Sequence, residues 1–355
     1  MRIPAIADAA DKHPSSGPNI DPLDGVRGFA ALLVLISHTN FLNIGDRGGA
    51  GVTLFFVLSS FLISMPFVKK PQEKFTRSGL VVYFQRRIKR ILPMYYFVLF
   101  FFIFIQISSV KIFIEHLLFL RADGHLWSIP QEMLFYLVLP LVLLVTIRIF
   151  KNDFKKSFSF LIIVSIIANL LLSPEIFALP GFSTYLAFRL GVFLTGVASA
   201  YVFVKIDPEK LFRLPFARIL LEALPFAIVI FLLFGSNTFA SAIGGMLHHN
   251  FSLAQPELYN WRTVGPYGYL SALLILSLSI YPRSFAGRFF SNIFMRLLGV
   301  VSFSFYLIHI FIINVLINNG ITKETPLLFI AAFIMTLAVS IVTYSLIERP
   351  FLKKS

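Results

Sequence analysis

The sequence predicts an all-α membrane protein with about ten transmembrane helices and both termini in the cytoplasm. Three observations support this prediction: the composition, a series of apolar segments of span length, and the distribution of positive charge. Of the 355 residues, 57% are hydrophobic and only 14% are charged. A soluble protein of this length is not so apolar. The net charge of +14 fits cytoplasmic loops, so we expect no nucleic-acid partner.

Ten segments of about 16 to 23 residues are apolar enough to cross a bilayer, close to the length that a hydrocarbon core requires. They are, in chain order, 26–43, 51–68, 91–110, 131–149, 158–173, 182–204, 219–235, 264–281, 297–318 and 326–347. With the N-terminus in the cytoplasm, 25 of the 31 Lys and Arg residues fall on the cytoplasmic side. This distribution favours an even number of spans and both termini inside.

The segments predict one membrane domain at 23–350, between a cytoplasmic N-terminal tail at 1–22 and a short cytoplasmic tail at 351–355. The first tail has no apolar core, so we expect no cleaved signal peptide. The longest connection, at 236–263, is too short for a sizeable soluble domain. The sequence has no cysteine, which excludes disulfides, thiolate catalysis and Cys-metal sites.

The first predicted span carries Arg27 and His38 on one face. Eleven steps of 100° end within 20° of three full turns and separate the two residues by about 16 Å along the axis, with Asp24 about 40° away. Ionisable residues inside a span are costly and usually functional. Snorkelling at the membrane surface is the alternative explanation for Arg27. A hydrogen bond to a neighbouring helix is the alternative for His38.

Three more ionisable residues fall within or at the start of predicted spans: Glu132, Arg189 and His309. Each indicates function, but an intramembrane ion pair also explains Arg189, and helix-to-helix hydrogen bonding also explains His309. His248 and His249 are adjacent in the 236–263 connection without a nearby carboxylate. We therefore expect no metal site.

Several segments, in order, resemble the acyltransferase-3 family of integral membrane O-acyltransferases. The first is the pattern of Arg, ten residues and His in LDGVRGFAALLVLISHTN (23–40). The others are GVTLFFVLSSFLIS (51–64), YFQRRIKRILPMYY (83–96), HLWSIPQEMLFYLVLPLVL (125–143), VSFSFYLIHIFI (301–312) and ERPF (348–351). Four residues depart from the usual pattern of Asp, Gly, a second acidic residue and Glu; they are Thr53, Ser60, Met133 and Val192.

The resemblance implies transfer of an acyl group, often acetyl, from cytoplasmic acyl-CoA to a hydroxyl of a carbohydrate at the outer face, which can be lipid-linked. It also implies a multi-pass protein of a bacterial cytoplasmic membrane. The sequence ends at residue 355, and we expect the form that lacks a fused esterase-like domain. We expect no tightly bound cofactor. Membrane lipids and, optionally, a second copy of the chain in a homodimer complete the expected partners.

The implied reaction gives each candidate residue a role. A neutral imidazole suits a general base, so we interpret His38 as the base or as a covalent acyl relay, with Glu132 orienting it or holding the acceptor. The positive-inside rule alone explains the eight Lys and Arg residues of the basic cluster at 69–90, but guanidinium groups also suit CoA phosphates. The predicted donor-binding residues are Arg27, Arg87, Arg90 and Arg189. The predicted acceptor-binding residues are Trp127, Tyr136 and His309. Interface anchoring is the alternative for Trp127 and Tyr136.

Two other classes of function compete with this interpretation. A transporter or flippase of an acyl carrier or lipid-linked sugar would also need many spans and buried charge. It predicts Gly or Pro interruptions in paired positions of two halves, and the sequence shows no such pairing. A non-catalytic scaffold in polysaccharide assembly leaves Arg27 and His38 unexplained. The sequence therefore favours an O-acyltransferase.

Overall fold

A computed structural model describes residues 21–41, 48–105, 108–121, 124–171, 185–235 and 256–352. Within these ranges every regular element is a helix. The long elements are α2 (Asp21–Thr39), α3 (Gly48–Lys69), α5 (Arg77–Phe104), α7 (Ser128–Arg148), α8 (Phe154–Leu171), α9 (Tyr185–Lys205), α11 (Ala217–Ile230), α13 (Pro256–Ile280), α16 (Ser302–Asn318) and α17 (Pro326–Thr343). The short elements are α4 (Pro71–Lys74), α6 (Val110–Leu117), η2 (Gly124–Trp127), α10 (Pro208–Phe212), η3 (Phe231–Gly235), α14 (Phe285–Phe290), α15 (Ile293–Val300), η4 (Tyr344–Glu348) and α18 (Arg349–Leu352).

Each of the ten predicted spans is mostly helix in its described part, although the third, 91–110, extends beyond the end of α5 at Phe104. The all-α prediction is confirmed for the described residues. Four helical segments of the described chain are long and apolar enough to cross a membrane, and a bent pair would make a fifth. The four are Gly48–Lys69, Gly124–Arg148, Ala217–Phe234 and Pro326–Leu352. The total of ten spans and the cytoplasmic termini therefore stay predictions.

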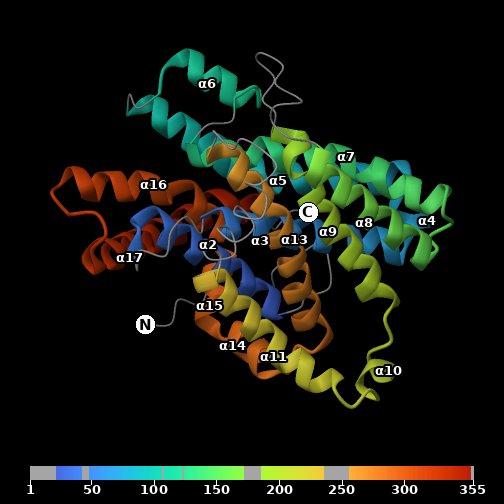
Figure 1. The fold of residues 1–355 in the computed structure, drawn as a ribbon. Coiled ribbons are helices and arrows are strands. Elements are labelled where there is room, and N and C mark those ends of the chain that lie inside the picture. Colours follow the sequence, from blue (N-terminus) through green and yellow to red (C-terminus); the bar gives the residue numbers. More distant parts are fainter. Residues whose placement is uncertain are drawn as a thin grey trace.

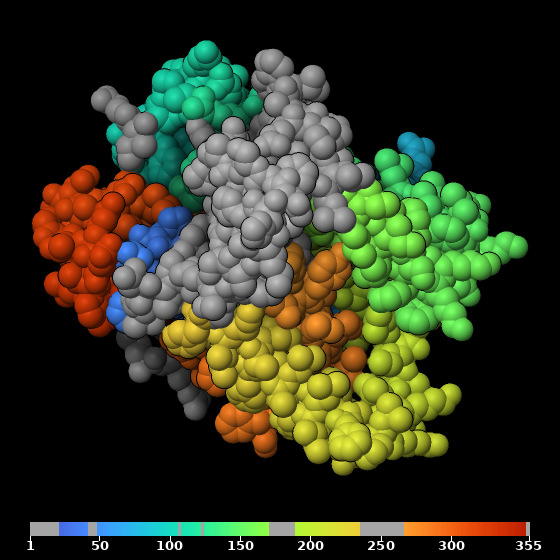
Figure 2. Space-filling model, in the orientation of Figure 1, coloured from blue at the N-terminus to red at the C-terminus, as the bar shows by residue number. Residues whose placement is uncertain are grey.

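Helix α3 lies at the centre of the molecule. Of its apolar stretch 83% is buried, against 28–44% for the other three candidate spans. It packs against α2, α9 and α13, while α16 and α17 lie to one side and α7 and α8 to the other (Figures 1 and 2). Outer helices instead expose large apolar side chains, among them Phe100 and Phe104 of α5 and Ile330 and Ile334 of α17. Such a surface fits an integral membrane protein.

The ninth predicted span, 297–318, is not one straight helix. It is divided at Val301 into α15 and α16, which meet at an angle of 76°. The two parts have different packing partners, because α15 lies against α2 whereas α16 packs mainly on α17. The bend brings the first turns of α16 to the cavity described below.

Helix α2 touches its neighbours through glycines. A Cβ built on Gly299 of α15 would lie 1.8 Å from the carbonyl oxygen of Asp24, and one on Gly25 would lie 1.8 Å from that of Phe290. A Cβ on Gly28 would lie 2.5 Å from the carbonyl oxygen of Met295. Small residues allow helix backbones to approach this closely. The contacts fix the position of α2 and the direction in which its polar face points.

Candidate functional site

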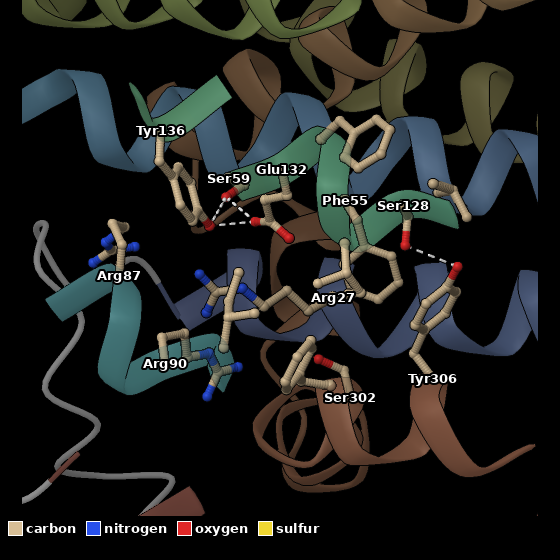
Figure 3. A pocket seen from close by; sticks show the side chains of 15 residues that line it. Arg27, Phe55, Ser59, Arg87, Arg90, Ser128, Glu132, Tyr136, Ser302 and Tyr306 are labelled. Carbon is tan, nitrogen blue, oxygen red and sulfur yellow. Dashed lines mark hydrogen bonds between the residues drawn. The ribbon is translucent and has the colours of Figure 1, made fainter. Parts of the chain in front are cut away.

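A cavity of about 100 Å³ lies where α2, α3, α5, α7 and α16 meet (Figure 3). Three arginines from α2 and α5 line it, so we call it the arginine cavity. Its lining residues are Arg27, Val52, Phe55, Phe56, Ser59, Arg87, Arg90, Ile91, Ser128, Ile129, Glu132, Tyr136, Ser302, Phe303 and Tyr306. It brings together five of the predicted site residues, namely Arg27, Arg87, Arg90, Glu132 and Tyr136.

Glu132 is the centre of a hydrogen-bonded group on one wall of the arginine cavity. The hydroxyl of Ser59 donates to Glu132 Oε1 at 2.7 Å, and the hydroxyl of Tyr136 donates to the same oxygen (Figure 3). The two hydroxyl oxygens are 3.2 Å apart. Glu132 and Tyr136 share a face of α7 because they are four residues apart. The carboxylate is thus held by two donors from two helices.

The arginines of α5 are three residues apart and face the cavity from one side of the helix. Arg90 Nη1 lies 3.2 Å from Glu348 Oε2 in η4, and Glu348 is only 2% exposed. The hydroxyl of Ser304 donates to the other oxygen of Glu348. The Arg87 guanidinium lies 5.8 Å from the centroid of the Tyr136 ring. One carboxylate contact uses only part of the five N–H donors of a guanidinium.

Two further contacts hold the edges of the cavity. Arg27 Nη1 lies 2.8 Å from Asp24 Oδ1, one turn earlier on α2. The Tyr83 hydroxyl donates to the carbonyl oxygen of Tyr136 at 2.8 Å. Burial raises the pKa of Tyr83, although the positive charge of Arg87 acts in the opposite direction. The phenol therefore stays protonated and ties α5 to α7.

His38 does not line the arginine cavity but belongs to a second group, the histidine cluster, formed by His38, His125 and His309. The rings of His38 and His309 have centroids 4.9 Å apart, and those of His125 and His309 are 5.5 Å apart. His309 is fully buried, whereas His38 is exposed. Two residues that were predicted for different tasks, catalysis and acceptor binding, are therefore neighbours.

Tyr306 joins the two groups. It lines the arginine cavity, and its hydroxyl accepts from Ser128 at 3.0 Å and donates to the carbonyl oxygen of His125. Its ring centroid lies 5.7 Å from that of His309, one turn further along α16. A continuous row of polar and aromatic side chains thus leads from the cavity to the histidine cluster.

Arg189 and Trp127 form a third group of predicted site residues. The Arg189 guanidinium lies 5.0 Å from the centroid of the Trp127 ring, and Trp127 also meets Phe56 edge-on at 5.9 Å. Neither Arg189 nor Trp127 lines the arginine cavity, although Trp127 contacts Phe56, which does. His248 and His249 lie outside the described residues. Among the residues that the structure does describe, no group of three or more His, Asp or Glu could hold a metal ion.

Of the four residues that depart from the family pattern, the two polar ones form hydrogen bonds within their own helix and the two apolar ones pack in or against the apolar core. The Thr53 hydroxyl donates to the carbonyl oxygen of Gly49 at 2.7 Å, and that of Ser60 donates to Val57 at 3.0 Å. Val192 is fully buried and Met133 packs on the apolar core. None of these four side chains lines the arginine cavity.

Sequence reasoning missed several residues of these groups, among them Ser59, His125, Ser128, Tyr306 and Glu348. All five lie inside segments quoted for the family resemblance. Hydroxyl groups gave no signal because most serines in apolar helices bond within their own helix. The segment ERPF resembles the family, but the sequence does not show that its Glu348 pairs with Arg90, which lies 258 residues earlier.

Comparison with known proteins gives a consistent result. A family model described as an acyltransferase domain matches residues 20–345. "Putative O-acetyltransferase SACOL0978" of Staphylococcus aureus (strain COL) is 25% identical over 378 residues, which cover 94% of this chain and 58% of that protein. "O-acetyltransferase OatA" of Staphylococcus aureus (strain NCTC 8325 / PS 47) is 25% identical over 371 residues, which cover 94% and 57%. The chain spans little more than half the length of these relatives. No solved structure matches it.

Proposed function

Because the chain belongs to the acyltransferase-3 family, whose model covers residues 20–345, we propose that it is a membrane O-acyltransferase. The donor is cytoplasmic acyl-CoA, in the first instance acetyl-CoA, and the acceptor is a hydroxyl of a cell-surface or exported carbohydrate. The observation that carries this proposal is the convergence of three arginines and Glu132 on one cavity between α2, α5 and α7. The relatives named as O-acetyltransferases support the choice of an acetyl group.

The arginine cavity suits the donor. CoA carries phosphates, and guanidinium groups bind phosphate oxygens through paired N–H donors. Arg27 and Arg90 each pair with a carboxylate, that of Asp24 and that of Glu348, neither of which lines the cavity. Those partners hold the guanidinium groups in place while leaving further N–H donors. Arg189 is outside this cavity and, beside the ring of Trp127, fits the acceptor side better than the donor side.

The chemistry requires a base for the acceptor hydroxyl. A neutral imidazole can take that proton as the oxygen attacks the thioester carbon, and it can return the proton to the departing CoA sulfur. We assign this role to His38, which is exposed and lies on α2 beyond Arg27. Glu132 is bound to Ser59 and Tyr136 rather than to His38. Its proposed role is therefore to order the wall of the arginine cavity that binds the donor.

The experiment uses the purified chain in lipid nanodiscs with acetyl-CoA. Since the chain has no cysteine, a thiol reagent reports only the CoA that is released. We expect CoA release that accelerates when the carbohydrate fraction of the producing cells is added, with radiolabelled acetyl appearing in that fraction in equal amount. A transporter would move label across a sealed vesicle without releasing CoA, and that result would overturn the proposal.

The acceptor is identified by mass spectrometry of surface carbohydrate from cells with and without the gene. We expect O-acetyl groups, seen as an alkali-labile addition, to disappear from one carbohydrate in the deletion strain and to return with the wild-type chain. An unchanged set of carbohydrates in an active enzyme would contradict the proposed acceptor class. Placement in a bacterial cytoplasmic membrane belongs to the same proposal, because acetyl-CoA is cytoplasmic.

A further inference from the structure

His309 contacts His38 across two helices that are far apart in the sequence. His309 Nε2 lies 3.4 Å from His38 Nδ1, and the rings meet edge-on with an interplanar angle of 67°. His309 lies on α16 with its side chain fully buried, and His38 lies in the last turn of α2. The hydrogen bonds of the two rings determine which nitrogen of each ring carries a hydrogen.

The neighbouring carbonyl groups determine the arrangement of these hydrogens. His309 Nδ1 lies 2.5 Å from the carbonyl oxygen of Tyr306, which can only accept. Nδ1 of His309 therefore carries the hydrogen, and in the neutral ring Nε2 has the lone pair. His38 Nδ1 lies 2.9 Å from the carbonyl oxygen of Val34 and must also carry a hydrogen. That hydrogen is shared between Val34 and the lone pair of His309.

These assignments leave one nitrogen of the pair as a base. With the hydrogen of neutral His38 on Nδ1, its lone pair is on Nε2, and His38 is the exposed member of the pair. When Nε2 takes up a proton, the ring becomes positive while Nδ1–H still points at an acceptor. The C-terminal end of α2 also favours positive charge in its last turn. The surroundings of His38 thus suit both states of a base.

We propose that His309 is a positioning residue for acyl transfer, a role that rests on the proposed function above. Its Nε2 accepts the Nδ1 hydrogen of His38 and so holds the His38 Nε2 lone pair for the acceptor. In the step itself the hydroxyl proton goes to His38 Nε2, the oxygen bonds to the acyl carbon, and the carbon–sulfur bond of the thioester breaks. The sulfur then receives the proton, giving the ester and free CoA and returning His38 to its starting form.

Two substitutions separate this role from mere packing. In His309→Asn the amide nitrogen can still donate to the carbonyl oxygen of Tyr306, but the side chain is too short to reach His38. In His309→Gln the longer amide can place its oxygen where the His309 Nε2 lone pair was. The matched control is His116→Asn, since His116 is another buried histidine, 4% exposed, and it contacts Tyr95 on α5 rather than the histidine cluster.

The measurement is the rate of CoA release from acetyl-CoA, with kcat and KM determined for each variant in nanodiscs. We expect His309→Asn to lower kcat about 10- to 100-fold, by analogy with the loss caused by removing the outer hydrogen-bond partner of a metal-bound imidazole, with KM for acetyl-CoA within about twofold of wild type. His309→Gln should keep at least a third of the wild-type kcat, and His116→Asn should keep nearly all of it.

Two results would overturn the inference: full activity of His309→Asn, or an equal loss in the Asn and Gln variants. If His309→Asn is not recovered as a monodisperse protein, His309→Met replaces it, because Met has the length of Gln without a strong acceptor. Met must then lose activity where Gln keeps it. A wild-type chain that releases no CoA contradicts the proposed function instead, so the two failures are distinguishable.

Discussion

The arginine cavity and the histidine cluster lie on the same face of α2, yet they differ in how their polar groups are balanced. In the cavity, cationic Arg27 and Arg90 are paired with carboxylates at 2.8 and 3.2 Å. In the histidine cluster, His38 and His309 are bound to backbone carbonyls and to each other. A carboxylate holds a permanent cation, whereas a carbonyl fixes a tautomer without adding charge. This difference agrees with our proposal that one region binds an anion and the other transfers a proton.

The strongest test of this division is His38→Ala. We expect acyl transfer to fall about 100- to 10,000-fold, the usual contribution of a general base, while KM for acetyl-CoA stays within about twofold of wild type. His38→Gln should be equally inactive, because Gln can accept a hydrogen bond but cannot take a proton at neutral pH. Residual activity of half the wild type in either folded variant would move the base elsewhere.

The complementary change in the cavity is Arg87→Gln. A hydrogen bond to a charged group contributes roughly 1.5–3 kcal/mol, so we expect KM for acetyl-CoA to rise about tenfold or more with a smaller change in kcat. Arg86→Gln is the matched control, because Arg86 is the adjacent residue on α5 and does not line this cavity. Equal KM values in the two variants would show that Arg87 does not bind the donor and only adds to the positive charge expected on the cytoplasmic side.

A smaller effect on binding is expected from Glu348→Gln, which leaves Arg90 with an amide where it had a carboxylate. Removing one partner of a buried ion pair destabilises a protein by about 3–5 kcal/mol in strong cases, so the melting temperature should fall. KM for acetyl-CoA should rise several-fold as Arg90 loses its position. Glu73→Gln, which breaks the exposed pair with Lys70, should change neither quantity.

Single cysteines test which side each region faces, with no expected loss of activity. Because the native chain has no cysteine, Thr322→Cys and Gln72→Cys each introduce one exposed thiol. From outside intact cells an impermeant thiol reagent should label position 322 and leave position 72 unlabelled. Position 72 precedes the basic half of α5, so labelling there would reverse the predicted orientation and place the arginine cavity toward the exterior.

The sequence predicted the content of the arginine cavity better than that of the histidine cluster. Arg27 and Glu132 stood out as charges at the ends of apolar spans, whereas Arg87 and Arg90 were identified through the family resemblance of a basic segment. The spacing of Arg27 and His38 correctly indicated one face of α2. It could not show that residues of α5, α7 and α16 line the cavity beside Arg27, or that His309 of α16 contacts His38, because His309 is 271 residues away.

Local rules also failed at the bend of the ninth predicted span. Prolines inside a helix are the usual cause of a break, but α3, α5 and α7 continue through Pro66, Pro93 and Pro140. The chain instead turns by 76° beside Val301, where no proline occurs. The competing packing of α15 on α2 and of α16 on α17 determines this bend, and single-sequence patterns carry no record of such long-range contacts.

The glycine contacts of α2 also determine which substitutions the protein tolerates. A Cβ on Gly299 would lie 1.8 Å from the carbonyl oxygen of Asp24, so even alanine would force α2 and α15 apart. That displacement would act at the residue that holds Arg27 and would shift the arginine with it. The charged face of α2 is therefore kept in place by close backbone contacts at glycines, together with an ion pair of 3.7 Å between Asp21 of α2 and Arg296 of α15. Variants designed to change donor or acceptor preference can therefore alter the side chains that line the cavity, but they must keep Gly25 and Gly299.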